Sequence, residues 1–109
     1  RDGKPPGMTD DAFPSEFELR RQADGLVYRF ARTTDPEGRT GFKRSDAEHW
    51  IVWHDALGWI AGTWDADAVF GRPWDQLSPQ SEVAPPEGVW VSRKGARAYV
   101  YDLVYTDAP

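Results

Sequence analysis

The sequence predicts an all-β protein, an antiparallel meander of about six strands whose sheet curls strongly into a sandwich or a small barrel. Two observations lead to this prediction. Aromatic and β-branched residues alternate between turn residues, as they do in pleated, half-buried strands, and six of the 109 residues are tryptophans. No stretch free of glycine and proline sustains the periodicity of an amphipathic helix, so we expect helix to be a minor component.

The first fifteen residues contain three prolines and two glycines, with Met8 and Phe13 as their large apolar side chains. Such a composition buries too little apolar surface to offset the entropy of ordering. We therefore divide the chain into an extended arm, residues 1–15, and one β-domain, residues 16–109, whose size fits a single domain.

The β-domain begins with a predicted hairpin. Residues 16–22 alternate apolar and charged side chains, and residues 26–32 continue as a second strand after the turn at 23–25. Residues 33–41 contain an Asp-Pro pair and two glycines, which predicts a loop. A short run opening at Phe42 follows, interrupted by charged residues.

The central hairpin is the clearest element, with strands at 49–54 and 59–64 joined by a turn. Residues 65–70 fit either one helical turn or a short strand. A long loop follows and ends at 85–88, in the run Pro-Pro-Glu-Gly. The last hairpin pairs residues 89–93 with residues 98–105.

Both faces of these strands are apolar. In the strand at 49–54, Ile51 and Trp53 point one way, while Trp50 and Val52 point the other. An open sheet with one solvated face would alternate more cleanly. Either the sheet closes on itself or one aromatic face docks onto a partner.

Composition excludes several classes. A net charge of −5 argues against a nucleic-acid partner, whose binding sites are basic and clustered. The chain has no cysteine, which removes disulfide scaffolds, thiolate metal sites and cysteine nucleophiles. No apolar run approaches the ~20 residues of a membrane-spanning helix, so we expect no membrane span. The sequence indicates no particular cellular compartment.

No catalytic, cofactor or metal site is predicted. His49 and His54, the only histidines, lie five apart and so face opposite sides of one strand, and only a pairing of His54 with Asp65 and Asp67 stays open. Asp102 is a charge within an apolar strand. Either it pairs with a partner such as a nearby arginine, or it is a charge on an edge strand that blocks aggregation. We therefore expect a protein that is not an enzyme.

The spacing of glycines and aromatics is similar to that of a tryptophan-rich β-module of eukaryotic, especially protist, proteins. The pattern runs from Gly38-Arg39 through Trp50-Ile51-Val52-Trp53 and Gly58-Trp59-Ile60 to Pro85-Pro86 with Gly88-Val89-Trp90, and spans about residues 25–90. The chain differs from the module at Thr40, where the module has a bulky residue. The resemblance implies a binding or assembly element and no catalytic residue.

We predict a non-catalytic interaction or accessory subunit of a larger assembly, with an organellar photosynthetic or respiratory complex as one host. Ten arginines against three lysines suit an interface, because guanidinium groups pair and stack well. The alternatives are a carbohydrate-binding module built on Trp50, Trp64 and Trp74 and, less favoured, a small β-barrel hydrolase or lyase using Asp102 or His54. The expected partner contacts are Phe13, Arg72, Trp74, Trp90 and Arg97.

Overall fold

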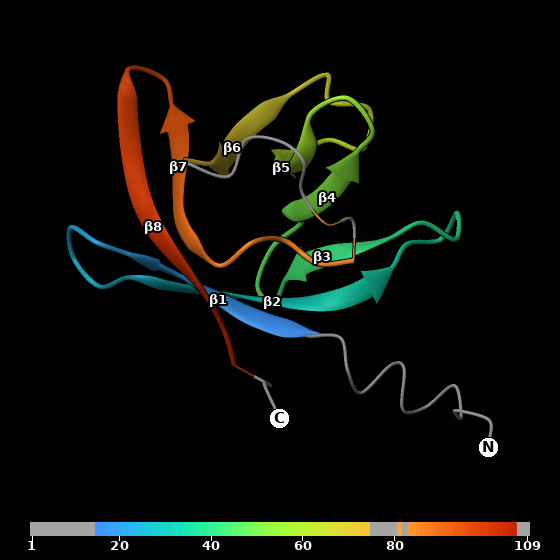
Figure 1. The fold of residues 1–109 in the computed structure, drawn as a ribbon, viewed down its shortest axis with the longest axis horizontal. Helices are drawn as coiled ribbons and strands as arrows, with labels where there is room; N and C mark the ends of the chain where they lie inside the picture. The colour runs from blue at the N-terminus through green and yellow to red at the C-terminus, as the bar shows by residue number, and fades with distance from the viewer. Residues whose placement is uncertain (1–14, 75–80, 82, 107–109) are drawn as a thin grey trace.

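Eight antiparallel strands form a closed barrel in which each strand pairs with the next and β1 pairs with β8 (Figure 1). The computed structural model describes residues 15–74, 81 and 83–106, so all of the predicted arm at 1–15 except Ser15 lies outside the described residues. The described residues contain no helix, and therefore none that is long and apolar enough to cross a membrane. The strands are β1 Glu16–Arg21, β2 Val27–Thr34, β3 Thr40–Arg44, β4 Trp50–His54, β5 Gly58–Gly62, β6 Val69–Pro73, β7 Gly88–Lys94 and β8 Arg97–Tyr105.

The predicted all-β meander and its strong curvature are confirmed, but the strand count is eight and not six. The two additional strands, β3 and β6, contain glycines that sequence rules read as loop signals. Gly41 in β3 lies where an added Cβ would be 3.0 Å from Trp64 Cη2, and Gly71 in β6 lies where it would be 3.1 Å from Ser92 Cβ. Both glycines therefore allow a close approach within the sheet.

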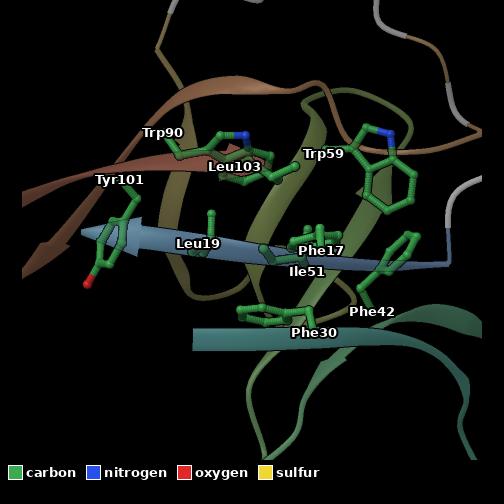
Figure 2. Close-up of a cluster of buried hydrophobic side chains, with 9 residues drawn as sticks. All are labelled: Phe17, Leu19, Phe30, Phe42, Ile51, Trp59, Trp90, Tyr101 and Leu103. Carbon is green, nitrogen blue, oxygen red and sulfur yellow. The ribbon is translucent and has the colours of Figure 1, made fainter. Parts of the chain in front are cut away.

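The core fills the interior of the barrel (Figure 2). An eight-stranded barrel is just wide enough for side chains to fill it. Phe17 lies among three rings, with centroids 5.2 Å from Phe30, 5.0 Å from Phe42 and 5.9 Å from Tyr105. Figure 2 draws the nine buried members of this cluster: Phe17, Leu19, Phe30, Phe42, Ile51, Trp59, Trp90, Tyr101 and Leu103.

A second apolar cluster covers the outer face of β4 and β5. Val52 and Ile60 are paired in register there, and both are fully buried. Trp64 follows β5 and packs beside Trp50, with ring centroids 5.3 Å apart. The guanidinium of Arg39 lies 4.7 Å from the Trp64 ring centroid, so the turns after β2 and β5 meet over this cluster. Both faces of β4 are thus covered within the chain.

Arginine–tyrosine stacks lie on the inner-facing positions at the end of the barrel that holds the β1–β2 turn. The guanidinium of Arg21 lies 4.9 Å from the Tyr99 ring centroid, and that of Arg44 lies 4.3 Å from the Tyr28 ring centroid. Such stacks are stabilising because the cation meets the negative face of the ring. The two arginines are also tied to Asp24 and Asp46 of the neighbouring turns.

The β1–β2 turn gives a pH prediction. Arg21 donates to both carboxylate oxygens of Asp24, at 3.0 and 2.8 Å, and the N–H of Leu26 also donates to Asp24. The Arg21 hydrogen bonds, followed by the Leu26 bond, lower the pKa of Asp24 from 3.8 to about 2. Because the folded pKa lies below the unfolded one, ionised Asp24 stabilises the fold above that unfolded value, and this contribution is lost as pH falls towards 2.

We therefore expect Asp24→Asn to be less stable than the wild type at neutral pH and equally stable near pH 2. Urea unfolding of both proteins at a series of pH values measures the difference in free energy. A difference that stays constant down to pH 2 would contradict the assignment to the Asp24 carboxylate.

Candidate binding face on strands β6 to β8

Strand β6 presents two exposed aromatic side chains on the outside of the barrel. Gly71 and Pro73 are buried and pair with Ser92 and Trp90, so the alternating positions of Phe70, Arg72 and Trp74 face outward. Phe70 is 50% exposed and Trp74 is 66% exposed, the two highest values among the large hydrophobic residues described. One side of the barrel thus carries an aromatic–arginine–aromatic row on its outer surface.

The two strands beside β6 extend this row with apolar side chains. Arg72 is paired in register with Val91, and Val91 is paired with Val100, which is 36% exposed. The N–H of Trp74 donates to the carbonyl of Val89 at 2.8 Å and so continues the ladder beyond β6. We name these five residues, Phe70, Arg72, Trp74, Val91 and Val100, the outer β6–β8 face.

Arg72 is held in place on this face. Its Nη2 donates to the carbonyl oxygen of Leu57, in the β4–β5 turn, at 2.9 Å. The guanidinium therefore keeps a fixed position on the barrel surface while the side chain stays exposed. A pre-positioned arginine loses less conformational entropy when a partner binds.

Exposed cations border the outer β6–β8 face. Arg93, Lys94 and Arg97 lie in the β7–β8 hairpin, where Arg93 is paired with Ala98 and Lys94 with Arg97. Among the described residues, neither these three cations nor Arg72 has a carboxylate within ion-pair distance. The charge of this region is therefore open to an external carboxylate, although the chain as a whole is acidic.

The predicted contact residues are distributed over three environments. Arg72 and Trp74 belong to the outer β6–β8 face, and Arg97 lies at the exposed tip of the β7–β8 hairpin. Phe13 lies outside the described residues. Trp90 is 2% exposed and packs in the core, so its ring is not part of the exposed surface.

Sequence reasoning missed Phe70. Residues 65–70 fitted either a helical turn or a short strand, so no face was assigned to position 70. The signal was present in the spacing, because Phe70, Arg72 and Trp74 follow one another at alternate positions. Extended backbone over residues 70–74 would have placed all three on one side.

The residues considered for catalysis take part in local structure. Asp102 accepts a hydrogen bond from Nε2 of Gln22 at 3.0 Å, and so its partner is not one of the arginines considered from the sequence. His54 Nδ1 accepts the N–H groups of Ala56 and Leu57, at 3.2 and 3.3 Å, and so caps the β4–β5 turn. These contacts give both side chains a role in turns or strand ends.

Asp65 shapes the turn after β5. Its Oδ1 accepts the N–H of Asp67 and the hydroxyl of Thr63, both at 2.9 Å. The Asp67 bond, followed by the Thr63 bond, lowers the pKa of the Asp65 carboxyl. Within the described residues, no group of three or more histidines, aspartates and glutamates lies together as a metal site would require.

The tryptophans considered for sugar binding do not form one flat platform. The rings of Trp50 and Trp64 are inclined at 51° to each other, and the Arg39 guanidinium stacks on Trp64. Trp74 lies after β6, on the outer β6–β8 face. A sugar-stacking role is therefore left to Trp74, whose ring is the most exposed of the three.

A shallow groove of about 260 Å³ lies beside β1 and β2. It is lined by Glu16, Phe17, Glu18, Arg29, Phe30 and Thr106. The charges in it compensate each other, because Glu18 pairs with Arg29 at 3.3 Å and with Arg20 at 2.9 Å. It is smaller than the usual small-molecule site of roughly 300–1,000 Å³ and is polar where such sites are mostly apolar.

The outer β6–β8 face is the arrangement among the described residues best suited to binding. It offers aromatic area, a fixed guanidinium and uncompensated positive charge, and it includes two residues expected from the sequence. Comparison of the chain with protein-family models, curated protein sequences and solved structures gave no significant match, so the argument about function rests on this geometry.

Proposed function

We propose that this chain is a non-catalytic interaction domain that docks onto another protein through the outer β6–β8 face. The observation that carries the proposal is the row Phe70, Arg72 and Trp74, in which the two most exposed large hydrophobic side chains of the described residues flank a guanidinium fixed by Leu57. A barrel that closes on itself has no internal need to expose these two rings.

The composition of the row matches that of binding hot spots. Tryptophan and arginine are enriched where truncation to alanine costs most, and each aromatic side chain can remove about 150–250 Å² from water. Val91 and Val100 extend the apolar area on β7 and β8. The face therefore has an apolar centre that a bound partner would shield from water.

The charges of the border indicate the chemistry of the partner. Arg72, Arg93, Lys94 and Arg97 favour a protein surface with an apolar depression and carboxylates around it. Such pairs act mainly on specificity and association rate. Membership of a larger assembly, an organellar photosynthetic or respiratory complex included, stays a prediction from the sequence.

The double variant Phe70→Ala/Trp74→Ala is expected to lose the partner. Each hot-spot truncation costs about 2 kcal/mol or more, so affinity should fall by a factor of roughly 10³. In native electrophoresis of an extract from the natural source, the wild-type chain should migrate in a large species and the added variant as a monomer. Its urea unfolding midpoint should stay close to that of the wild type, because both side chains are exposed.

A matched control is Leu26→Ala/Val27→Ala. Both residues are 39% exposed and lie at the β1–β2 turn, which is not paired with β6 and is not part of the outer β6–β8 face. This control should keep the large species. A photo-crosslinking residue at position 74 should join the chain to the same partner that mass spectrometry finds in that species, and one at position 26 should not.

The alternative function, carbohydrate binding, would use the Trp74 indole as well. Titration calorimetry distinguishes it from protein binding. If titration with an oligosaccharide releases heat, and Trp74→Ala abolishes that heat, the ligand of this face is a glycan and not a protein. Migration of the wild-type chain near its monomer mass of 12.3 kDa in the extract, with no crosslink at position 74, would overturn the proposed function.

A further inference from the structure

The end of the barrel at which β7 begins is closed by the chain segment that precedes β7. Pro85 in this segment is fully buried. In the view of Figure 1 the segment crosses from β7 in the direction of β3. We call residues 84–86, Ala-Pro-Pro, the proline segment.

Aromatic side chains of β7 and β8 hold this segment through its backbone carbonyls, and one of β5 holds Ser81, which precedes the segment. Trp90 Nε1 donates to the carbonyl of Pro86 at 3.0 Å, and the Tyr105 hydroxyl donates to the carbonyl of Pro85. Trp59 Nε1 donates to the carbonyl of Ser81 at 2.8 Å. We call Trp59, Trp90 and Tyr105 the aromatic cradle; Figure 2 shows Trp59 and Trp90 within the core cluster.

The chemistry of the cradle is that of proline-rich peptide recognition. A proline fixes its own φ and biases the residue before it towards the polyproline II conformation, so the Ala-Pro-Pro sequence favours this conformation. A polyproline II backbone has no internal hydrogen bonds and presents its carbonyls to a partner. Domains that bind such segments use aromatic-lined grooves, as this barrel end does.

We propose that the aromatic cradle is a binding site for a proline-rich peptide of another protein, and that the chain's own proline segment occupies it as an internal competitor. A segment that only closed the barrel end would need apolar side chains and no hydrogen bonds to its carbonyls. Here the Trp90 indole and the Tyr105 phenol donate to the carbonyls of Pro86 and Pro85, which any Pro-Pro peptide in the same conformation also presents. This site is separate from the outer β6–β8 face and does not depend on the function proposed for it.

The segment joins β7 at a glycine. Gly88 adopts a φ of 113°, which other residues rarely reach, and a Cβ added there would meet nothing within 4 Å. Glu87 holds the segment beside this glycine, because its carboxylate accepts the N–H of Tyr105 at 3.0 Å. The proposal requires an open state in which these contacts are broken while the β7–β8 ladder, which begins at the Gly88–Leu103 pair, stays formed.

Internal competition sets the expected affinities. A peptide binds only molecules whose cradle is open, so its apparent Kd is its intrinsic Kd divided by the open fraction. Weakening the proline segment raises that fraction. The double variant Pro85→Gly/Pro86→Gly should therefore bind a free peptide with an apparent Kd at least about tenfold lower than that of the wild type.

The probe is the blocked peptide Val-Ala-Pro-Pro-Glu-Gly, which copies residues 83–88. Binding is followed by NMR through the indole N–H signal of Trp90, which should shift on addition of the peptide because the peptide supplies the carbonyl that Pro86 supplies in the chain. The same peptide with both prolines replaced by alanine should not bind. Pro36→Gly, which changes an exposed proline of the β2–β3 turn, should bind the probe like the wild type.

Four outcomes overturn the proposal: an unchanged Trp90 indole signal in the double variant, equal affinity of variant and wild type, equal binding of the alanine peptide, and a dimer that exchanges the segment between two copies. If the double variant folds only when the peptide is added, that result supports the proposal. If it does not fold at all, Pro86→Ala replaces it, since Pro86 is only partly buried, and the same tenfold criterion of about 1.4 kcal/mol applies.

Discussion

Phe17→Ala is expected to lower the free energy of unfolding by about 3–5 kcal/mol, because truncation of a buried phenylalanine removes its transfer free energy and leaves a cavity. Phe17 is 1% exposed and contacts the rings of Phe30, Phe42 and Tyr105. These rings come from β2, β3 and β8, so they cannot all move inward to fill the space. Since domains are stable by about 5–15 kcal/mol, the variant should be marginal at 25 °C.

Urea unfolding followed by tryptophan fluorescence measures this loss. The matched control is Phe70→Ala, which removes the same side chain from a position that is 50% exposed and should cost no more than about 0.5 kcal/mol. A cost below about 1 kcal/mol for Phe17→Ala would show that the barrel interior repacks and is not close-packed around this ring.

Gly62→Ala is expected to cost about 3 kcal/mol, the upper part of the usual range for overpacking. A Cβ at this position would overlap the carbonyl oxygen of Ala68 and lie 3.1 Å from Val69 Cα. These are backbone atoms of the β5–β6 connection. Two hydrogen bonds hold that connection, from Thr63 N to Ala68 O at 2.9 Å and from Ala68 N to Thr63 Oγ1 at 3.0 Å.

The control for this prediction is Gly25→Ala. Gly25 has a φ of 74°, but a Cβ there would meet nothing within 4 Å, so this substitution tests backbone conformation without overlap and should cost about 1–2 kcal/mol. Chemical denaturation of the two variants side by side gives the comparison. If Gly62→Ala proves the milder of the two, the connection between β5 and β6 yields to the methyl group.

The runs of aromatic and β-branched residues between turn residues were enough to predict six of the strands. They were not enough for β3 and β6. Gly41 and Gly71 lie in these strands because another side chain passes close to the backbone, and that neighbour is distant in sequence. Residue propensities describe the isolated position and contain no information about such a neighbour.

The candidate site shows the same limit. Trp74 and Trp90 look alike in the sequence, each a tryptophan beside an apolar strand, yet one is 66% exposed and the other 2%. Trp90 is paired with Tyr101 and so faces the interior, which exists only because β1 and β8 close the barrel. Which tryptophan is exposed therefore follows from the closure, which the sequence left open between a barrel, a sandwich and a docked sheet.

The pairing of the first strand with the last has a consequence for synthesis. Leu19 is paired with Leu103, so this contact joins residues from the two extremes of the described chain. During translation β1 emerges long before β8. Until β8 follows, β1 can pair only with β2, and its other edge is unpaired. Contacts of such high sequence separation also slow folding, since a long loop must close before they form. The nascent barrel therefore has an exposed strand edge, able to pair with other chains, until β8 has left the ribosome.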